Sequence, residues 1–294
     1  PRQGAQDTSM NSASDPDSRG YVFATTGPDY TALAMHSATM LRGIVGDTPI
    51  DLFTDQPFHR PTFEGPFDTV HSLGDGFFRP KFDALIRSRF ARTIYLDADI
   101  WPVADPSDIF DLLDRFDVAM AHDPYRATEH AITTWRQNLP TAFPQYNSGV
   151  IGARQTPATQ ATWQAVIDGI LADAVPRDQG VLREVLWTGN LRIATLPEEY
   201  NLMGLRAVNI LSSDCTAPRL IHSPRLHATF RKRKAPIETL SDLLGRTAAE
   251  QVTRLVASDP TLGGDGARVR PLIRRGIMEI LSRPLGLVRG RFQR

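Results

Sequence analysis

The sequence predicts an α/β protein whose central sheet is mostly parallel and is covered by helices on both faces. Short runs rich in β-branched and aromatic residues alternate with roughly ten- to fifteen-residue amphipathic stretches, the pattern of strand–helix–strand units. The 294 residues, 41% of them hydrophobic, suffice for one large domain or two small ones. A single cysteine, Cys215, excludes a disulfide framework and a multi-cysteine zinc site.

The predicted strands and helices follow one another along the chain. A strand is expected at Tyr21–Thr26, where an apolar run stops at Gly27-Pro28, and a helix is expected from about Asp29 to Arg42. The remaining predicted elements are a strand at Ile50–Thr54, a helix over 80–90, a strand at Thr93–Leu96, a helix near 107–114, strands near Asp117–Ala121 and Gln145–Ala153, and helices over 157–171, Glu238–Leu244 and Ala248–Ala257.

Composition divides the chain into three segments. Residues 1–20 have only Met10 as a large apolar side chain, so this segment is expected to be disordered. Residues 21–235 carry the alternating pattern and form the main domain. Residues 236–294 are expected to form a helical C-terminal extension with an amphipathic, Arg-rich tail.

The C-terminal tail is strongly basic, although the whole chain is neutral, with 33 basic and 33 acidic residues. From Gly266 to Arg294 there are eight arginines and one acid, Glu279, which gives +7. An anionic membrane surface could attract this helix, or the helix could dock on the acidic body. Nucleic acid is not an expected partner, because Phe292 is the tail's one aromatic residue.

Hydropathy indicates neither a membrane span nor a signal peptide. We therefore expect a cytoplasmic protein, with a peripheral position on the inner membrane face as the alternative that the tail allows.

The sharpest chemical motif is the run Thr93–Leu96, which leads directly into Asp97 and Asp99. In open α/β sheets, ligands bind beyond the carboxyl ends of the strands, where these two carboxylates would emerge. Carboxylate oxygens suit Mg²⁺ or Mn²⁺. An isolated D-x-D is also a common strand-end turn, and the aspartyl-phosphate phosphohydrolases end a strand with D-x-D, although Gly-Thr normally follows there.

Three further segments carry polar residues at element ends, and each also has a purely structural explanation. Asn147-Ser148-Gly149 begins an apolar run, either as a turn or as a hydrogen-bonding group for a sugar hydroxyl. Asp178-Gln179 begins a helix, where Asp178 could be an N-cap. His222 ends an apolar run, where a histidine is either a structural residue or an imidazole ligand that favours Mn²⁺ over Mg²⁺.

Together these motifs resemble the GT-A-fold glycosyltransferases, specifically the glycogenin-like family 8 and its bacterial galactosyl- and glucosyltransferase relatives. The resemblance spans about Tyr21 to Arg225. It rests on five motifs that occur in the order of that family: Tyr95-Leu-Asp-Ala-Asp99, Asn147-Ser-Gly-Val150, Asp178-Gln179, Leu196-Pro-Glu-Glu-Tyr-Asn201 and Ile221-His222.

The resemblance implies a GT-A catalytic domain at 21–235 with a Rossmann-like sheet. It implies that Asp97, Asp99 and His222 hold Mn²⁺ (or Mg²⁺). Asp178 and Gln179 are the implied catalytic pair, with Gln179 beneath the anomeric carbon. The implied donor-binding residues are Ala24, Thr25, Thr26, Asp29, Tyr30, Lys81, Asp97, Ala98, Asp99, Asp123, Asn147, Ser148 and Arg225.

One motif departs from the family. Its late histidine often continues as H-F-x-G-x-x-K-P-W, in which the lysine grips the diphosphate. Here the sequence reads His222-Ser-Pro-Arg-Leu-His-Ala228, with neither that glycine nor that lysine. Arg225 or Arg231 is the candidate replacement, and the acceptor side is open to being rebuilt.

The implied activity is transfer of a hexose from a UDP-sugar to a hydroxyl of a carbohydrate, glycolipid or protein acceptor, with retention of configuration. Gln179 is a poor nucleophile, which favours a same-face route, while Asp178 remains the candidate for a transient covalent intermediate. Two alternatives stay open. A metal-dependent nucleotidyltransferase would usually carry a Gly-rich basic loop that Thr25–Pro28 lacks, and a non-catalytic carbohydrate- or nucleotide-binding relative need not retain all three metal ligands.

Overall fold

A computed structural model of the chain describes residues 15–56, 65–73, 79–132 and 134–273. They divide into two compact units. The first comprises the residues up to Met203 together with Arg219–Pro236, and the second comprises Gly204–Pro218 and the residues from Ile237 onward. Among the described residues, no helix combines the length and the hydropathy needed to cross a membrane.

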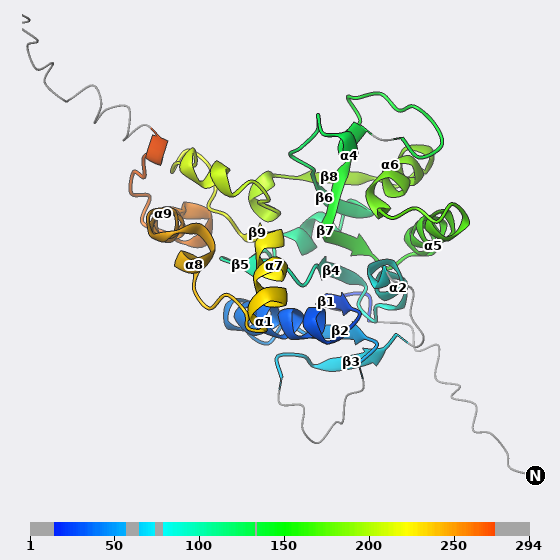
Figure 1. The fold of residues 1–294 in the computed structure, drawn as a ribbon, viewed down its shortest axis with the longest axis horizontal. Coiled ribbons are helices and arrows are strands. Elements are labelled where there is room, and N and C mark those ends of the chain that lie inside the picture. Colours follow the sequence, from blue (N-terminus) through cyan, green and yellow to red (C-terminus); the bar gives the residue numbers. More distant parts are fainter. Residues whose placement is uncertain (1–14, 57–64, 74–78, 133, 274–294) are drawn as a thin grey trace, which may run out of the picture. The chain divides into compact units, whose positions relative to one another are not determined.

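The first unit is built on a seven-stranded sheet in the order β3-β2-β1-β4-β7-β6-β8 (Figure 1). β7 is antiparallel to β4 and β6, and the other neighbouring strands are parallel. The carboxyl ends of β1, β4 and β6 therefore meet at one edge of the sheet, and the predicted mostly parallel α/β fold is confirmed. The strands are β1 (Arg19–Thr25), β2 (Ile50–Thr54), β3 (Thr69–Ser72), β4 (Arg92–Leu96), β6 (Val118–His122), β7 (Tyr146–Arg154) and β8 (Ile193–Leu196).

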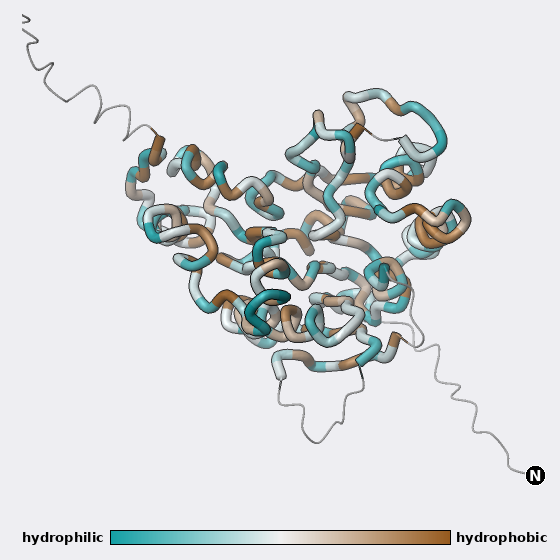
Figure 2. The backbone as a smooth tube through the Cα atoms, in the orientation of Figure 1, coloured by the Kyte–Doolittle hydropathy of each residue, from teal (hydrophilic) through white to brown (hydrophobic). Residues whose placement is uncertain are grey.

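Helices cover both faces of this sheet (Figure 1). Because successive side chains of a strand point to opposite faces, Tyr21 and Phe23 share a core with α1, α3 and α7, whereas Val22 and Ala24 share one with α2, α5 and α6. Figure 2 shows hydrophilic residues along much of α7, whose Leu226 and Phe230 are buried. The helices are α1 (Pro28–Val45), α2 (Pro80–Arg87), α3 (Ile109–Leu112), α4 (Glu129–Ile132), α5 (Pro157–Ala172), α6 (Asp178–Thr188) and α7 (Pro224–Arg233), with a 3₁₀ turn η2 (Glu198–Tyr200).

A second, two-stranded sheet joins two distant parts of the first unit. β5 (Ile100–Pro102) pairs antiparallel with β9 (Leu220–His222), with Ile100 opposite His222. The Ser37 hydroxyl of α1 donates to the Ile100 carbonyl at 2.7 Å and holds β5 in place. Since Asp99 directly precedes β5 and His222 ends β9, this pairing brings both residues to the same place.

Regular structure begins before the predicted boundary at residue 21. Residues 1–14 of the segment predicted as disordered lie outside the described residues, but β1 begins at Arg19. The Ser18 carbonyl accepts the Arg92 N–H at 3.0 Å, and its hydroxyl accepts the Ala91 N–H at 2.9 Å. These bonds hold the start of β1 beside β4, so the strand begins two residues before the start that its hydropathy predicts.

The second unit is helical, as the sequence predicts for the C-terminal extension. Its Gln251 side chain, fully buried on α9, donates to the carbonyls of Leu211 at 3.1 Å and Arg270 at 2.9 Å. Residues 204–218, which sequence analysis assigned to the domain at 21–235, therefore belong with α9. Most of the predicted Arg-rich tail, residues 274–294, lies outside the described residues. The elements are η3 (Leu205–Asn209), α8 (Leu240–Leu244), α9 (Arg246–Ser258) and η4 (Pro260–Leu262).

Candidate active site

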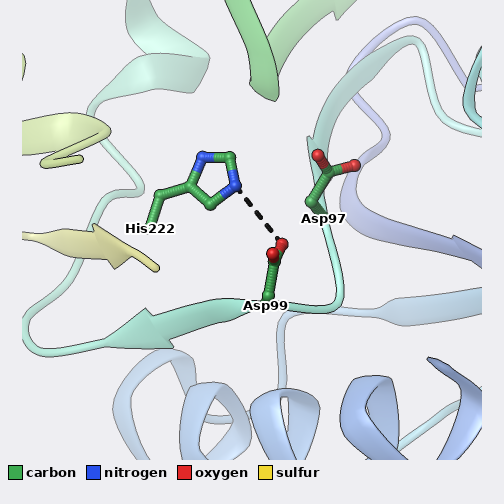
Figure 3. Close-up of side chains that lie close together, drawn as sticks. All are labelled: Asp97, Asp99 and His222. Atoms are coloured by element: carbon green, nitrogen blue, oxygen red, sulfur yellow. Dashed lines mark ion pairs between the residues drawn. The ribbon is translucent and has the colours of Figure 1, made fainter. Parts of the chain in front are cut away.

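Two carboxylates and an imidazole converge where β4 ends. Asp97 and Asp99 follow β4, and the Asp97 N–H donates to the Gly149 carbonyl of β7 at 2.8 Å. Figure 3 shows the side chains of Asp97, Asp99 and His222 pointing toward one another. His222 Nε2 lies 3.3 Å from Asp99 Oδ1, and one ligand atom from each of the three residues lies within 4.8 Å of the others.

This group fits a divalent cation. Carboxylates and a neutral imidazole are donors that Mn²⁺, Mg²⁺ and related ions accept in proteins. Gly149 leaves the space that the imidazole occupies, because a Cβ on residue 149 would lie 2.3 Å from Cε1 of His222. The predicted triad is therefore assembled in space, from a strand end, a turn and a second sheet.

Asp99 and His222 stabilise each other's charged form. Burial alone would raise the pKa of Asp99 and lower that of His222. Their mutual attraction outweighs burial in both, so the pKa of Asp99 is below its usual value and that of His222 is above it.

A buried lysine lies beside the triad. Lys81 Nζ lies 3.0 Å from Asp97 Oδ1, 2.9 Å from Ser148 Oγ and 3.7 Å from Asp178 Oδ2. Ser148 in turn donates to Asp178 Oδ2 at 2.9 Å. Burial would lower the pKa of Lys81, but Asp97 and Asp178 outweigh it and hold that pKa above its usual value. Lys81 is therefore a charged bridge between the two carboxylates.

Asp178 is not an N-cap, contrary to the structural alternative. Arg177 is the N-cap of α6, and Asp178 turns its buried carboxylate toward Lys81 and Ser148. Burial would raise the pKa of Asp178, but Lys81, Arg79 and the Ser148 hydroxyl lower it below its usual value. Asp178 is thus held as a carboxylate. Beside it, Gln179 Nε2 lies 3.5 Å from Asp123 Oδ2, so a predicted catalytic residue and a predicted donor-binding residue lie together.

A pocket of about 260 Å³ opens beside these residues, at the carboxyl edge of the sheet. It contains eight of the predicted donor-binding residues. The lining residues are Ala24, Thr25, Thr26, Tyr30, Arg79, Pro80, Lys81, Tyr95, Asp97, Ala98 and Asp99.

Helix α7 packs against Tyr30, one of the residues that line this pocket. The Tyr30 ring stacks on His227 at 4.2 Å between centroids, and its hydroxyl lies 3.2 Å from His227 Nδ1. Asp29, a predicted donor contact, accepts from Lys234 at 2.7 Å. Arg225 is exposed on α7 and is not among the lining residues. The segment that departs from the family motif is thus a regular helix.

Three residues near the site were missed in the sequence. Arg79 and Tyr95 line the pocket, and the Tyr95 hydroxyl donates to Asp97 Oδ1 at 2.7 Å. Asn201 Oδ1 lies 3.1 Å from His222 Nδ1. Tyr95 and Asn201 stand inside the motifs that predict the site, so their position was the available signal, whereas Arg79 is marked only by its place before Pro80 at a helix start.

Residues 84–229 match the sequence model of a family described as nucleotide-diphospho-sugar transferase. That stretch contains Asp97, Asp99, Asn147, Asp178 and His222. Among curated proteins, no sequence matches the chain.

Solved structures share the fold at low sequence identity. An active-site mutant of LgtC is 13% identical, with a TM-score of 0.54 over 81% of this chain and 95% of LgtC. The galactosyltransferase LgtC with donor and acceptor sugar analogues gives 11% identity and a TM-score of 0.52 over 80% and 96%. The glycosyltransferase GlyE of Streptococcus pneumoniae TIGR4 gives 17% and 0.55, over 81% of this chain and 62% of GlyE. With the family match at 84–229 and the shared architecture, the chain is a GT-A-fold relative of the family 8 glycosyltransferases.

Proposed function

We propose that this protein is a metal-dependent glycosyltransferase that moves a hexose from a UDP-sugar to an acceptor hydroxyl with retention of configuration. The observation that carries the proposal is the convergence of Asp97, Asp99 and His222 at the edge of a pocket at the carboxyl end of the sheet. In open α/β sheets this edge is where ligands bind.

Different residues in and beside the pocket would suit the different parts of a nucleotide-sugar. Thr25, Thr26 and the half-exposed Tyr30 form a wall suited to a base and a ribose. Asp97, Asp99 and His222 would hold Mn²⁺, or Mg²⁺, and the imidazole favours Mn²⁺. When bound, the cation would neutralise charge that builds on the leaving diphosphate.

The buried side of the site supports the same-face route to retention. Oδ2 of Asp178 accepts a hydrogen bond from Ser148 and lies 3.7 Å from Lys81 Nζ, and both interactions stabilise the negative charge that an attacking carboxylate would have to share. A carboxylate held in this way is a poor attacking group. Gln179, next to it, would contact the sugar at its anomeric carbon, and the acceptor (a carbohydrate, a glycolipid or a protein) would attack from the leaving-group face.

Calorimetric titration of UDP into the protein, with Mn²⁺ and with EDTA, tests the proposal. We expect at least tenfold tighter binding with Mn²⁺, followed by slow Mn²⁺-dependent hydrolysis of a UDP-hexose. Binding without hydrolysis would instead indicate a non-catalytic relative, and a requirement for a nucleoside triphosphate would indicate a nucleotidyltransferase. Equal UDP affinity with Mn²⁺ and with EDTA would refute the metal centre.

For the C-terminal tail we propose peripheral attachment to an anionic inner membrane face, which would bring a lipid-linked acceptor within reach. The eight arginines against one acid between Gly266 and Arg294 support it. We expect the full chain to co-sediment with phosphatidylglycerol vesicles at low salt, and a chain truncated after Asp265 to stay in the supernatant. Equal sedimentation of both chains would refute a membrane role for the tail.

A further inference from the structure

A chain of hydrogen bonds connects the backbone of β7 to His222. The Gly149 N–H donates to Asn147 Oδ1 at 2.9 Å, Asn201 Nδ2 donates to the same oxygen at 2.9 Å, and Asn201 Oδ1 faces His222 Nδ1 at 3.1 Å. The side chains of Asn147, Asn201 and His222 are buried, with exposed fractions of 3%, 2% and 7%. Mismatched partners in this chain would be costly, because little water is available to replace them.

The direction of every bond in this chain follows from its first member. A backbone N–H is always a donor, so the atom of Asn147 that faces it is the carbonyl oxygen. The atom of Asn201 that faces that oxygen must then be its NH₂ group, which leaves the carbonyl of Asn201 facing the ring. A carbonyl only accepts, so Nδ1 of His222 carries a hydrogen.

This polarity decides which ring nitrogen is available to a cation. In a neutral imidazole with a hydrogen on Nδ1, Nε2 has the free lone pair. Nε2 is also the nitrogen that lies toward Asp99. Metal-binding histidines commonly donate their other N–H to a fixed acceptor, which sets the tautomer and the ring orientation.

Two backbone features fix the two asparagines. Asn201 directly follows η2, and its neighbour Leu202 donates to the Leu220 carbonyl while His222 N–H donates to the Leu202 carbonyl, at 2.9 and 3.0 Å. Asn201 and His222 are thereby held side by side. Gly149 permits the close approach, since a Cβ there would lie 2.5 Å from Nδ1 of His222 and 2.9 Å from Asn147 Oδ1.

We propose that Asn147 and Asn201 are positioning residues that fix the tautomer and orientation of His222, so that Nε2 faces the cation. This inference rests on the proposed function, in which His222 is a metal ligand. It gives Asn147, the residue predicted to bond a sugar hydroxyl, a role inside the protein, because its side-chain carbonyl accepts two hydrogen bonds there.

Mn²⁺ affinity, measured by electron paramagnetic resonance without any nucleotide, tests whether the two asparagines support cation binding by His222. Asn201→Leu removes both bonds at similar volume and should weaken Mn²⁺ binding by about 10- to 100-fold. Asn147→Ala should weaken Mn²⁺ binding less, because the Asn201 side chain stays beside His222 and loses only the hydrogen bond that sets which of its ends faces the ring. The double variant should be no worse than Asn201→Leu alone, since both residues act through one chain of bonds. The exposed Asn190, after α6, supplies the control Asn190→Ala, which should bind as the wild type does.

The ring itself gives a test that needs no metal. Nitrogen NMR of ¹⁵N-histidine-labelled, metal-free protein, recorded at a pH at which an NMR titration shows the ring to be neutral, reports which nitrogen carries the hydrogen, and His222→Gln identifies the signal. We expect the hydrogen on Nδ1 in the wild type. In Asn201→Leu, where Nδ1 has lost its acceptor, we expect it on Nε2, which faces the Asp99 carboxylate.

The two measurements fail in different ways. A hydrogen on Nε2 in the wild type would overturn the inference, as would wild-type Mn²⁺ affinity in Asn201→Leu. Absence of Mn²⁺ binding by the wild type, with the hydrogen on Nδ1 as expected, would refute the proposed metal site while leaving the tautomer assignment intact.

Discussion

Replacing Asp99 by alanine or asparagine is expected to abolish the Mn²⁺-dependent part of UDP binding and to slow UDP-hexose hydrolysis by about 10²- to 10⁴-fold. Asp99 is the carboxylate that lies against His222 and directly precedes β5, so no other described acid can take its place in the triad. A cation that stabilises the leaving group contributes several kcal/mol, and each 1.4 kcal/mol corresponds to tenfold in rate.

Asp47→Asn is the matched control, because it makes the same charge change on an exposed residue before β2, at the opposite edge of the sheet. The Mn²⁺-dependent UDP affinity and the rate of UDP-hexose hydrolysis should be unchanged in that variant. Thermal unfolding of the metal-free proteins separates loss of the ligand from loss of the fold. Mn²⁺-dependent UDP binding that survives in a folded Asp99→Ala protein would contradict the metal centre.

The parts of the fold that were predictable are those fixed by local sequence. The strand at Ile50–Thr54 has its predicted bounds, and the helix predicted over 157–171 is α5, which begins after the capping residue Thr156. The missed strands β3, β5, β8 and β9 have three or four residues each. Such short strands have too little periodicity to read, and they exist because a partner strand pairs with them.

Helix α7 was missed for a different reason. The resemblance to the family identifies His222–Ala228 only as a departure from a motif, yet Ser223-Pro224 is a helix-start signal. The Ser223 side chain accepts the Arg225 N–H at 3.3 Å, and Pro224 occupies the first turn. Read locally, the sequence predicts this helix.

In the candidate site, too, the residues marked by local motifs were predictable, whereas the contacts made by tertiary structure were not. Motifs at strand ends identified Asp97, Asp99 and His222, because the end of a strand predicts where a side chain emerges. The bond from Asn201 to Asn147 was not predictable, since it depends on how β9 lies beside η2 and β7. Asp178 shows the same limit: its helix-start position suggested a cap, and only the tertiary placement of Lys81 reveals its partner.

Lys81→Met is expected to lower the free energy of unfolding of the metal-free protein by about 3–5 kcal/mol at pH 7. Lys81 is only 7% exposed and its ammonium lies between Asp97 and Asp178. Methionine has a similar length, so the variant mainly removes the charge. Asp178, itself 5% exposed, then remains as a buried carboxylate that has lost its strongest cationic partner and keeps only the weaker attraction of Arg79, which is the costly way to break a buried pair.

Two comparisons separate this charge effect from general disruption. Lys81→Met combined with Asp178→Asn should recover most of the loss, because the buried anion is gone and an amide can still bond Ser148. Lys234→Met removes a lysine from an exposed pair with Asp29 and should cost at most about 1 kcal/mol. Urea unfolding in EDTA measures all of these variants.

The loss should also shrink as the pH falls. In the wild type the pKa of Asp178 is lowered on folding, so its pairing stabilises the fold above about pH 4 and is lost as the pH falls through the folded-state pKa. In Lys81→Met the uncompensated burial raises that pKa, so protonation relieves the penalty. Both changes act in the same direction, and the difference between the two proteins should be smaller at pH 4.5 than at pH 7. A pH-independent loss, or one no larger than that of Lys234→Met, would mean that Lys81 supports the fold by packing, with the buried charges compensated elsewhere.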